Sequence, residues 1–182
     1  MNAPAPRFQP QDPDFAARVR ASFARQKAMD LIGASIATVE PGYVEIRLPF
    51  REDLTQQKGY VHGGILGMIC DSACGYSAFS LMPADCSLVT VEYKINILNP
   101  ALGPLVARGQ VVKPGRTLTV TRGDVYSADG THVASMQQTL LMLADDPGAK
   151  PDMETWTRRM GHDMLGFEQE GKLMKFLVKR NK

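Results

Sequence analysis

The 182-residue sequence is poor in the residues that build disulfide frameworks and metal sites. It contains three cysteines and three histidines: Cys70, Cys74, Cys86, His62, His132 and His162. An odd number of cysteines argues against a disulfide framework, and no histidine stands at metal-ligand spacing from the Cys70 and Cys74 pair. We therefore expect buried, unreactive thiols, no metal site and no cofactor.

Long hydrophobic runs and a strong charge of one sign are also absent. No stretch approaches the ~20 continuous apolar residues of a membrane span. Residues 1–15 lack the hydrophobic core of a signal peptide. The net charge of +2 is too small to indicate nucleic acid as the main partner. We expect a cytoplasmic protein with one well-packed domain, no membrane segment and no nucleic-acid partner.

The two ends of the chain carry helical patterns. Residues 1–31 combine a Pro- and Ala-rich tail with an amphipathic helix over 14–31. Its apolar side chains recur at near-helical intervals, at Phe15, Val19, Phe23 and Leu31. Residues 144–182 predict a linker over 144–152 and then one or two short helices. We interpret their basic end as a solvated surface.

Between these ends, residues 32–143 predict one domain built around a buried helix. The segment from Gly63 to about Leu81 is apolar nearly all round and rich in small residues, so we expect it to be buried on every side. Alternating apolar and polar residues predict a hairpin over 34–50 and strands over 87–98, 105–113, 117–127 and 132–143. Gly-containing turns join the last three strands into antiparallel hairpins. The predicted fold class is α+β, an antiparallel sheet of about five to six strands wrapped around one long central helix.

Asp71 stands alone among apolar residues in the middle of this helix. A carboxylate there costs several kcal/mol of desolvation unless it is paired, hydrogen-bonded or protonated. No Lys or Arg lies within four residues of it to form a pair along the helix. Two interpretations stay open. Either the acid faces water or a side chain from elsewhere in the fold, or it is a catalytic acid or base in a cleft.

His62, Gly63 and Gly64 open the same helix. A glycine pair can simply mark a turn, and a histidine can simply cap a helix. Alternatively, the first amides are unpaired donors at the positive end of the helix dipole, where a ligand carbonyl can approach a backbone without side chains. Asp71 follows Gly63 by about 12 Å along the axis, too far for one carbonyl to reach both. Either they act separately, or a two-fold dimer combines Gly63 of one subunit with Asp71 of the other.

The segment "VHGGILGMICD" (61–71) resembles the signature of hotdog-fold acyl-CoA thioesterases of the phenylacetate-degradation type. In that family a His-Gly-Gly opens the central helix and an acid follows nine positions after the His. The resemblance covers about residues 32–143. It includes the hairpin "EPGYVEIRLPF", the strand "VTVEYKINILNPA" and the last three strands. It implies a hotdog fold and hydrolysis of an aryl- or medium-chain acyl-CoA thioester.

The resemblance also implies catalytic roles for four residues. The Gly63 amide polarises the thioester carbonyl. Asp71 of the partner subunit activates water as a general base or attacks as a nucleophile. Gln56 stands where the related hydroxybenzoyl-CoA type has a glutamine that contacts the thioester, and His62 supports the loop or the carbonyl.

The expected substrate contacts include one departure from the family. Some relatives hold the water with a hydroxyl four residues after the acid, where this chain has Gly75, and Thr90 is the candidate replacement. Gly64 is expected to contact the substrate beside Gly63. The phosphates of coenzyme A require basic groups near the mouth of the cleft, although ordinary hairpin charges remain the alternative interpretation. The candidates are Arg108, Lys113 and Arg116.

We expect a homodimer as the minimum active unit and a homotetramer as the assembled form. A non-catalytic acyl-CoA-binding or regulatory protein on the same fold is the first alternative. A hotdog dehydratase or hydratase is the second, and the His-Gly-Gly entry to the helix argues against it.

Overall fold

The computed structural model describes residues 8–144, 149–170 and 173–179. They fall into two units, the first ending at Met142 and the second beginning at Leu143. The helices of the first unit are α1 (Phe15–Phe23), α2 (Lys27–Ile32) and α3 (Gly63–Phe79), with a 3-10 turn η1 (Glu52–Leu54). The strands of its sheet are β1 (Ser35–Glu40), β2 (Tyr43–Leu48), β3 (Cys86–Ile97), β4 (Leu105–Lys113), β5 (Leu118–Ser127) and β6 (His132–Ala144). The second unit contains α4 (Ala149–Arg159), β7 (Asp163–Glu170) and β8 (Leu173–Lys179).

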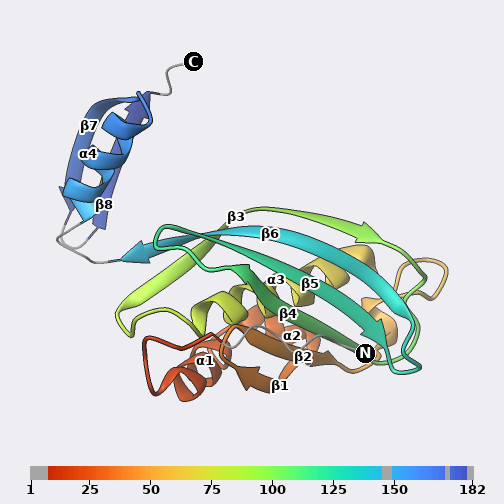
Figure 1. Cartoon of the computed structure of the whole chain (residues 1–182). Coiled ribbons are helices and arrows are strands. Elements are labelled where there is room, and N and C mark those ends of the chain that lie inside the picture. Colours follow the sequence, from red (N-terminus) through yellow and green to blue (C-terminus); the bar gives the residue numbers. More distant parts are fainter. Residues whose placement is uncertain (1–7, 145–148, 171–172, 180–182) are drawn as a thin grey trace. The chain divides into compact units, whose positions relative to one another are not determined.

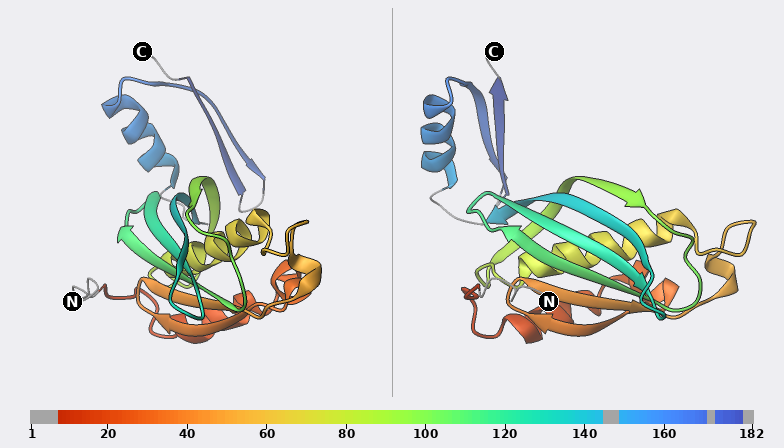
Figure 2. Two further views of the ribbon diagram at one scale, coloured as in Figure 1. Left: turned by 90° about the vertical axis from the view of Figure 1, so that its right-hand side faces the viewer. Right: turned by 45° about the vertical axis from the view of Figure 1, so that its right-hand side comes forward.

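The sheet of the first unit has the strand order β1-β2-β4-β5-β6-β3. The pairs from β1 to β6 are antiparallel. The sheet curves around α3, which lies along its concave face (Figures 1 and 2). The predicted α+β class, a sheet wrapped around one central helix, is confirmed.

The core forms where the inward side chains of the sheet meet α3. On β2, Val44, Ile46 and Leu48 are buried in alternation. The 17-residue helix α3 buries Leu66 and Ile69 among others, and it contacts β2, β3, β4, β5 and α1. Each such apolar side chain contributes ~1.5–3 kcal/mol on burial. Contacts on several sides explain why this helix is apolar nearly all round.

Two glycines of the sheet let α3 approach closely. Gly109 on β4 pairs with Gly123 on β5. A Cβ atom on Gly109 would lie closer than 3.0 Å to the backbone of Ala73, and one on Gly123 would lie closer than 3.0 Å to the sulfur atoms of Cys70 and Cys74. The glycine pair therefore forms a groove in which the helix backbone sits.

Alanine in place of Gly109 is expected to lower the free energy of unfolding by at least about 3 kcal/mol, because a helix backbone cannot move aside as a side chain can. Urea unfolding followed by circular dichroism measures the change. Gly67→Ala is the control, since the added methyl on α3 would meet Tyr93 Oη at an ordinary 3.6 Å. That variant should be neutral or more stable by up to about 1 kcal/mol. Wild-type stability of Gly109→Ala would contradict the groove.

The paired cysteines of α3 are core residues. Cys70 and Cys74 are buried free thiols. A hydrogen bond with Cys74 and burial raise the pKa of the Cys70 thiol well above its ordinary value, so that thiol stays protonated at neutral pH. The expectation of buried thiols is confirmed for this pair, whereas Cys86 is only half-buried.

β3 is the last strand of the sheet, and its outer edge is unpaired among the described residues. It is 12 residues long, and most of its side chains are exposed. The exposed large apolar residues are Val89, Val91, Tyr93 and Ile97. A long apolar edge strand invites pairing with another chain.

The expected single helix over 14–31 is wrong. The amides of Arg25 and Gln26 bond to the carbonyl oxygens of residues 22 and 23, so α1 ends in a tight turn before α2 begins. The break directs Met29 and Ile32 into the core and leaves Leu31 74% exposed. The six-residue gap between Phe23 and Met29 already departs from helical spacing.

The expectation of one or two helices after residue 152 holds only up to Arg159, where α4 ends, and is wrong for the hairpin that follows. α4 starts at Ala149, inside the expected linker, and an antiparallel hairpin of β7 and β8 follows it. Phe167 and Phe176 pack across the hairpin with ring centroids 5.1 Å apart. Lys150 of α4 lies over the Phe167 ring. A bulge beside Gly166 interrupts the alternation of β7 and obscures the strand pattern.

Some of the C-terminal expectations lie outside the described residues. These are the linker over 145–148 and the parts of the basic end at 171–172 and 180–182. In the described part of the chain, no helix is long and apolar enough to cross a membrane.

Candidate active site

Asp71 makes its hydrogen bonds through one carboxylate oxygen. The residue is half-buried in the middle of α3. Thr90 Oγ1 on β3 donates to Asp71 Oδ1 at 2.8 Å, and the side-chain amide of Gln138 on β6 donates to the same oxygen. Within the described residues, Oδ2 receives no hydrogen bond. The carboxylate therefore keeps one oxygen that can take a proton from a bound molecule.

Gln138 is one site residue that the sequence alone did not reveal. Its side chain is 1% exposed, and Nε2 also donates to Thr90 Oγ1 at 2.7 Å. A buried amide that meets both acceptors fixes the orientation of the carboxylate. A signal was present in the sequence, because Gln138 takes an inward position between the buried Met136 and Leu140 on β6.

A cavity of about 660 Å³ begins at the Asp71 cluster and extends along α3. Its floor is one face of the helix, and its second wall is β3. The lining residues of α3 are Asp71, Ser72, Gly75, Tyr76 and Phe79, and those of β3 are Cys86, Ser87, Leu88 and Thr90. Asp71, Gly75 and Phe79 follow one another at intervals of four and so lie along one side of the helix.

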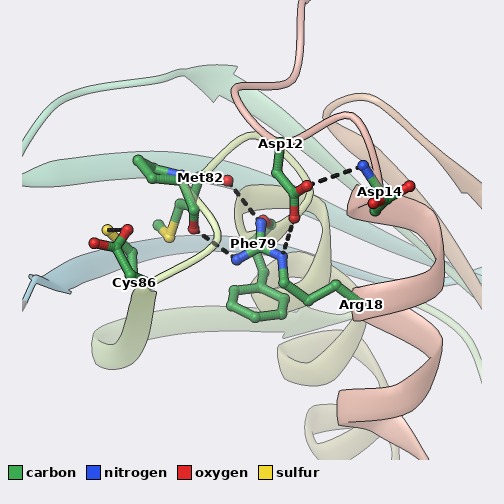
Figure 3. Close-up of polar contacts among 8 residues, drawn as sticks. Asp12, Asp14, Arg18, Phe79, Met82 and Cys86 are labelled. Carbon is green, nitrogen blue, oxygen red and sulfur yellow. Dashed lines mark hydrogen bonds and ion pairs between the residues drawn. The ribbon is translucent and has the colours of Figure 1, made fainter.

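α1 supplies the third wall of the cavity, and Arg18 fixes it in place (Figure 3). The Arg18 guanidinium donates to the carbonyl oxygens of Phe79 at 3.1 Å, Met82 at 2.6 Å and Pro83 at 2.7 Å. It also forms an ion pair with Asp12 at 2.8 Å. The last carbonyls of a helix lack intrahelical partners, so this arginine caps α3 while it anchors α1.

The first turn of α3 leaves one amide available. His62 is the N-cap, and its Nδ1 accepts from the Gly64 amide at 3.0 Å. The Ile65 amide donates to the His62 carbonyl at 2.9 Å. Among the described residues the Gly63 amide has no acceptor, so it is the donor left for a ligand. The Gly64 amide is already bonded to His62, and contact of Gly64 with the substrate stays a prediction.

Gln56 shapes the loop before α3. Its Oε1 accepts from the Lys58 amide at 2.6 Å, and its own amide donates to the Tyr60 carbonyl at 2.8 Å. No described contact joins Gln56 to Asp71 or His62. Within one chain the structure therefore separates this expected catalytic residue from the carboxylate.

The three expected basic contacts lie apart from the Asp71 cluster. Arg108 is on the exposed side of β4, where its Nε pairs with Glu45 at 3.0 Å and its guanidinium lies 4.9 Å from the Tyr126 ring centroid. Lys113 ends β4, and Arg116 follows in the turn to β5. None of the three lines the cavity. Their contact with the phosphates of coenzyme A stays a prediction, which depends on the second subunit.

Comparison with known proteins shows to which family the chain belongs. The sequence model of the thioesterase superfamily matches residues 58–134. A crystal structure of a thioesterase family protein from Silicibacter pomeroyi is 48% identical with a TM-score of 0.69, and the match covers 71% of this chain and 98% of that chain. The chain belongs to the thioesterase superfamily. As a thioesterase it is a thioester hydrolase, and the resemblance seen in the sequence is confirmed.

Other relatives match the same part of the thioesterase. A Halobacterium salinarum protein whose name describes an esterase is 29% identical over 144 residues, which cover 73% of this chain and 95% of that protein. The Escherichia coli PaaI protein from the phenylacetic acid degradation operon shares the fold at 18% identity, with a TM-score of 0.68, over 72% of this chain and 94% of that chain.

The C-terminal part of the thioesterase has a different likeness. The model of the sulfurtransferase TusA matches residues 133–180. A stretch of 43 residues is 40% identical to YrkI of Bacillus subtilis, whose name describes a sulfur carrier, and covers 24% of this chain and 57% of YrkI. All cysteines of the thioesterase precede residue 133. The matched segment therefore has no thiol on which sulfur could be carried.

Proposed function

We propose that this thioesterase hydrolyses acyl-CoA, with Asp71 as the general base and the Gly63 amide as the oxyanion donor. The observation that carries the proposal is the Asp71 carboxylate. This carboxylate lines the cavity. Thr90 and Gln138 donate hydrogen bonds to its Oδ1, whereas no described residue donates to its Oδ2. A carboxylate held in this way can accept a proton in a defined direction.

The reaction follows from these two groups. Water bound between Asp71 and the thioester loses a proton to Oδ2, and its oxygen forms a bond to the carbonyl carbon. The Gly63 amide donates to the oxyanion of the tetrahedral intermediate. The C–S bond then breaks, the CoA sulfur takes up the proton held by Asp71, and a carboxylic acid leaves. Direct attack by Asp71 on the carbonyl is the alternative route.

A two-fold dimer brings the two groups together. Gly63 and Asp71 are about 12 Å apart along α3 of one chain. The open edge and exposed apolar residues of β3 support self-pairing of that strand, because the same patch on a second copy is its complement. In the proposed dimer the two copies of α3 run antiparallel, and Gly63 of each copy lies near Asp71 of the other. A homotetramer and a cytoplasmic location stay predictions.

The non-catalytic alternative is less well supported. A regulatory acyl-CoA-binding protein needs a cavity, but it needs neither an oriented carboxylate with a free oxygen nor an unpaired amide at the start of a helix. A fixed carboxylate with an oxygen that faces the cavity is what proton transfer requires, and an amide without an acceptor is what oxyanion binding requires.

Proline in place of Gly63 is expected to lower kcat by about 10²–10³-fold, because it removes the donor N–H. Proline is tolerated at the first position of a helix, and His62 at ψ 139° has the backbone conformation that precedes proline. Thiol release over a panel of acyl-CoAs measures the effect.

Gly63→Ala is the matched control, since it adds the same Cβ, 2.8 Å from the flexible end of Ile97, but keeps the N–H. It should retain activity within about tenfold of wild type. Equal rates in the proline and alanine variants would remove Gly63 from the mechanism. Binding of acyl-CoA without turnover in the wild type would favour the regulatory alternative.

A further inference from the structure

The cavity beside Asp71 has both apolar and polar lining residues, and the polar ones gather around Arg25 and Asp71. Its lining includes the side chains of Ser22, Arg25, Gln26, Ser72 and Ser87. Polar groups that face a bound hydrocarbon lose water without gaining a partner, which costs affinity. An acyl group with a polar substituent inside the cavity avoids that cost.

Arg25 is the cation that a ligand can use. Arg18 also lines the cavity, but it is paired with Asp12 and bonded to backbone carbonyl oxygens (Figure 3). Arg25 is exposed, and no carboxylate of the described residues forms an ion pair with it. Asp71 is the one carboxylate among the lining residues, so the rest of the cavity favours an anion.

Tyr76 and Ser22 add hydrogen-bonding groups next to Arg25. The Tyr76 hydroxyl lies 3.3 Å from Ser22 Oγ, and the tyrosine is 8% exposed. Burial raises the pKa of Tyr76, while the Ser22 hydrogen bond and the charge of Arg25 act in the opposite direction. The phenol stays protonated at neutral pH and can donate to an anion. The hydroxyls of Ser22 and Tyr76 and the guanidinium of Arg25 therefore lie together where α1 and the turn after it face α3.

The separation of this group from Asp71 sets the length of the ligand. Tyr76 follows Asp71 by five residues, about 7.5 Å along the helix axis. Gly75 lies between them without a side chain, and both Gly75 and Leu88 line the cavity at this level. A short dicarboxylic acyl group such as adipyl has a length of this order, which makes it the substrate to test.

We propose that the cavity selects an acyl group with a free terminal carboxylate, bound by Arg25 and the hydroxyl of Tyr76. The substrate class is the CoA monothioester of a short dicarboxylic acid. This inference rests on the proposed acyl-CoA hydrolysis. Arg25 and Ser22 lie outside residues 58–134, the part that the superfamily model matches.

Steady-state hydrolysis of adipyl-CoA and hexanoyl-CoA tests the inference, because these acyl groups match in chain length and differ in the terminal carboxylate. The wild type is expected to have a kcat/KM about tenfold higher for adipyl-CoA, mainly through KM. Arg25→Met should lower this ratio about tenfold, and Arg25→Glu should invert the preference. Higher ionic strength should reduce the wild-type ratio, since Arg25 is exposed.

Arg20→Met is the matched control, because Arg20 is an exposed arginine on α1, five residues before Arg25, and does not line the cavity. It should keep the wild-type ratio. Equal kcat/KM values for the two substrates in the wild type would overturn the inference. An Arg25→Met variant with the wild-type ratio of the two kcat/KM values would also overturn it, even if both kcat/KM values fell by the same factor. If hydrolysis depends on Asp71 but adipyl-CoA is not preferred over hexanoyl-CoA, only this inference is overturned. If the wild type hydrolyses no acyl-CoA, the proposed function is overturned as well.

Discussion

Asparagine in place of Asp71 is expected to lower kcat/KM for acyl-CoA hydrolysis by about 10³-fold, because an amide cannot take the proton from water. The substitution suits the site. The amide oxygen of asparagine can still accept from Thr90 and Gln138, as Oδ1 does now. The nitrogen replaces Oδ2, the oxygen that the mechanism uses. Thiol release measures the loss, and circular dichroism with thermal unfolding verifies that the variant is folded.

Asp53→Asn is the control for this experiment. Asp53 forms an exposed ion pair with Arg51 at 2.6 Å, outside the cavity. The same chemical change there should leave kcat/KM within about twofold of wild type, since exposed pairs contribute little. Wild-type turnover by a folded Asp71→Asn variant would remove Asp71 from the mechanism.

Dimers that combine two different inactive variants are expected to recover activity. Asp71→Asn and Gly63→Pro chains are each expected to be nearly inactive alone, yet an equal mixture should recover about one quarter of the wild-type activity. Half of the dimers in such a mixture contain one chain of each kind. In every mixed dimer one site combines the intact Gly63 of one chain with the intact Asp71 of the other. Co-expression of the two chains, followed by the thiol-release assay, measures the recovery.

A mixture of two Asp71→Asn preparations carrying different tags is the control and should recover nothing. If Gly63 and Asp71 of the same chain formed one site, no mixed dimer would contain an intact site. Absence of recovery, with mixed dimers verified by the two tags, would therefore contradict the shared site.

The sequence revealed those parts of the site that are locally unusual. A lone carboxylate in an apolar helix is visible without any knowledge of the fold, and so is a glycine pair at its start. Gln138 was not found, because an inward amide on β6 matters only if that strand lies beside Asp71, which depends on pairing between distant segments. Arg25 was missed for the same reason. It lines the cavity only because α1 ends at Phe23 and the following turn lies against α3.

The fold was predictable where a pattern repeats within a few residues. The strands of the sheet alternate clearly, and their bounds differ from the predicted ones by about one residue. Gly109 and Gly123 gave no local signal, because their groove exists only in the register that sets them opposite each other. The hairpin of β7 and β8 was mistaken for helix because the bulge beside Gly166 breaks the period-two pattern.

The exposed face of β3 places the enzyme under a double constraint. In the proposed dimer this strand both completes two active sites and covers an edge that would otherwise recruit other chains. A substitution that weakens the pairing would cost turnover and colloidal stability at the same time. Dilution would act in the same way, since it separates the subunits that hold the two halves of each site. The sequence of this strand would therefore be constrained by subunit association as much as by folding of the chain.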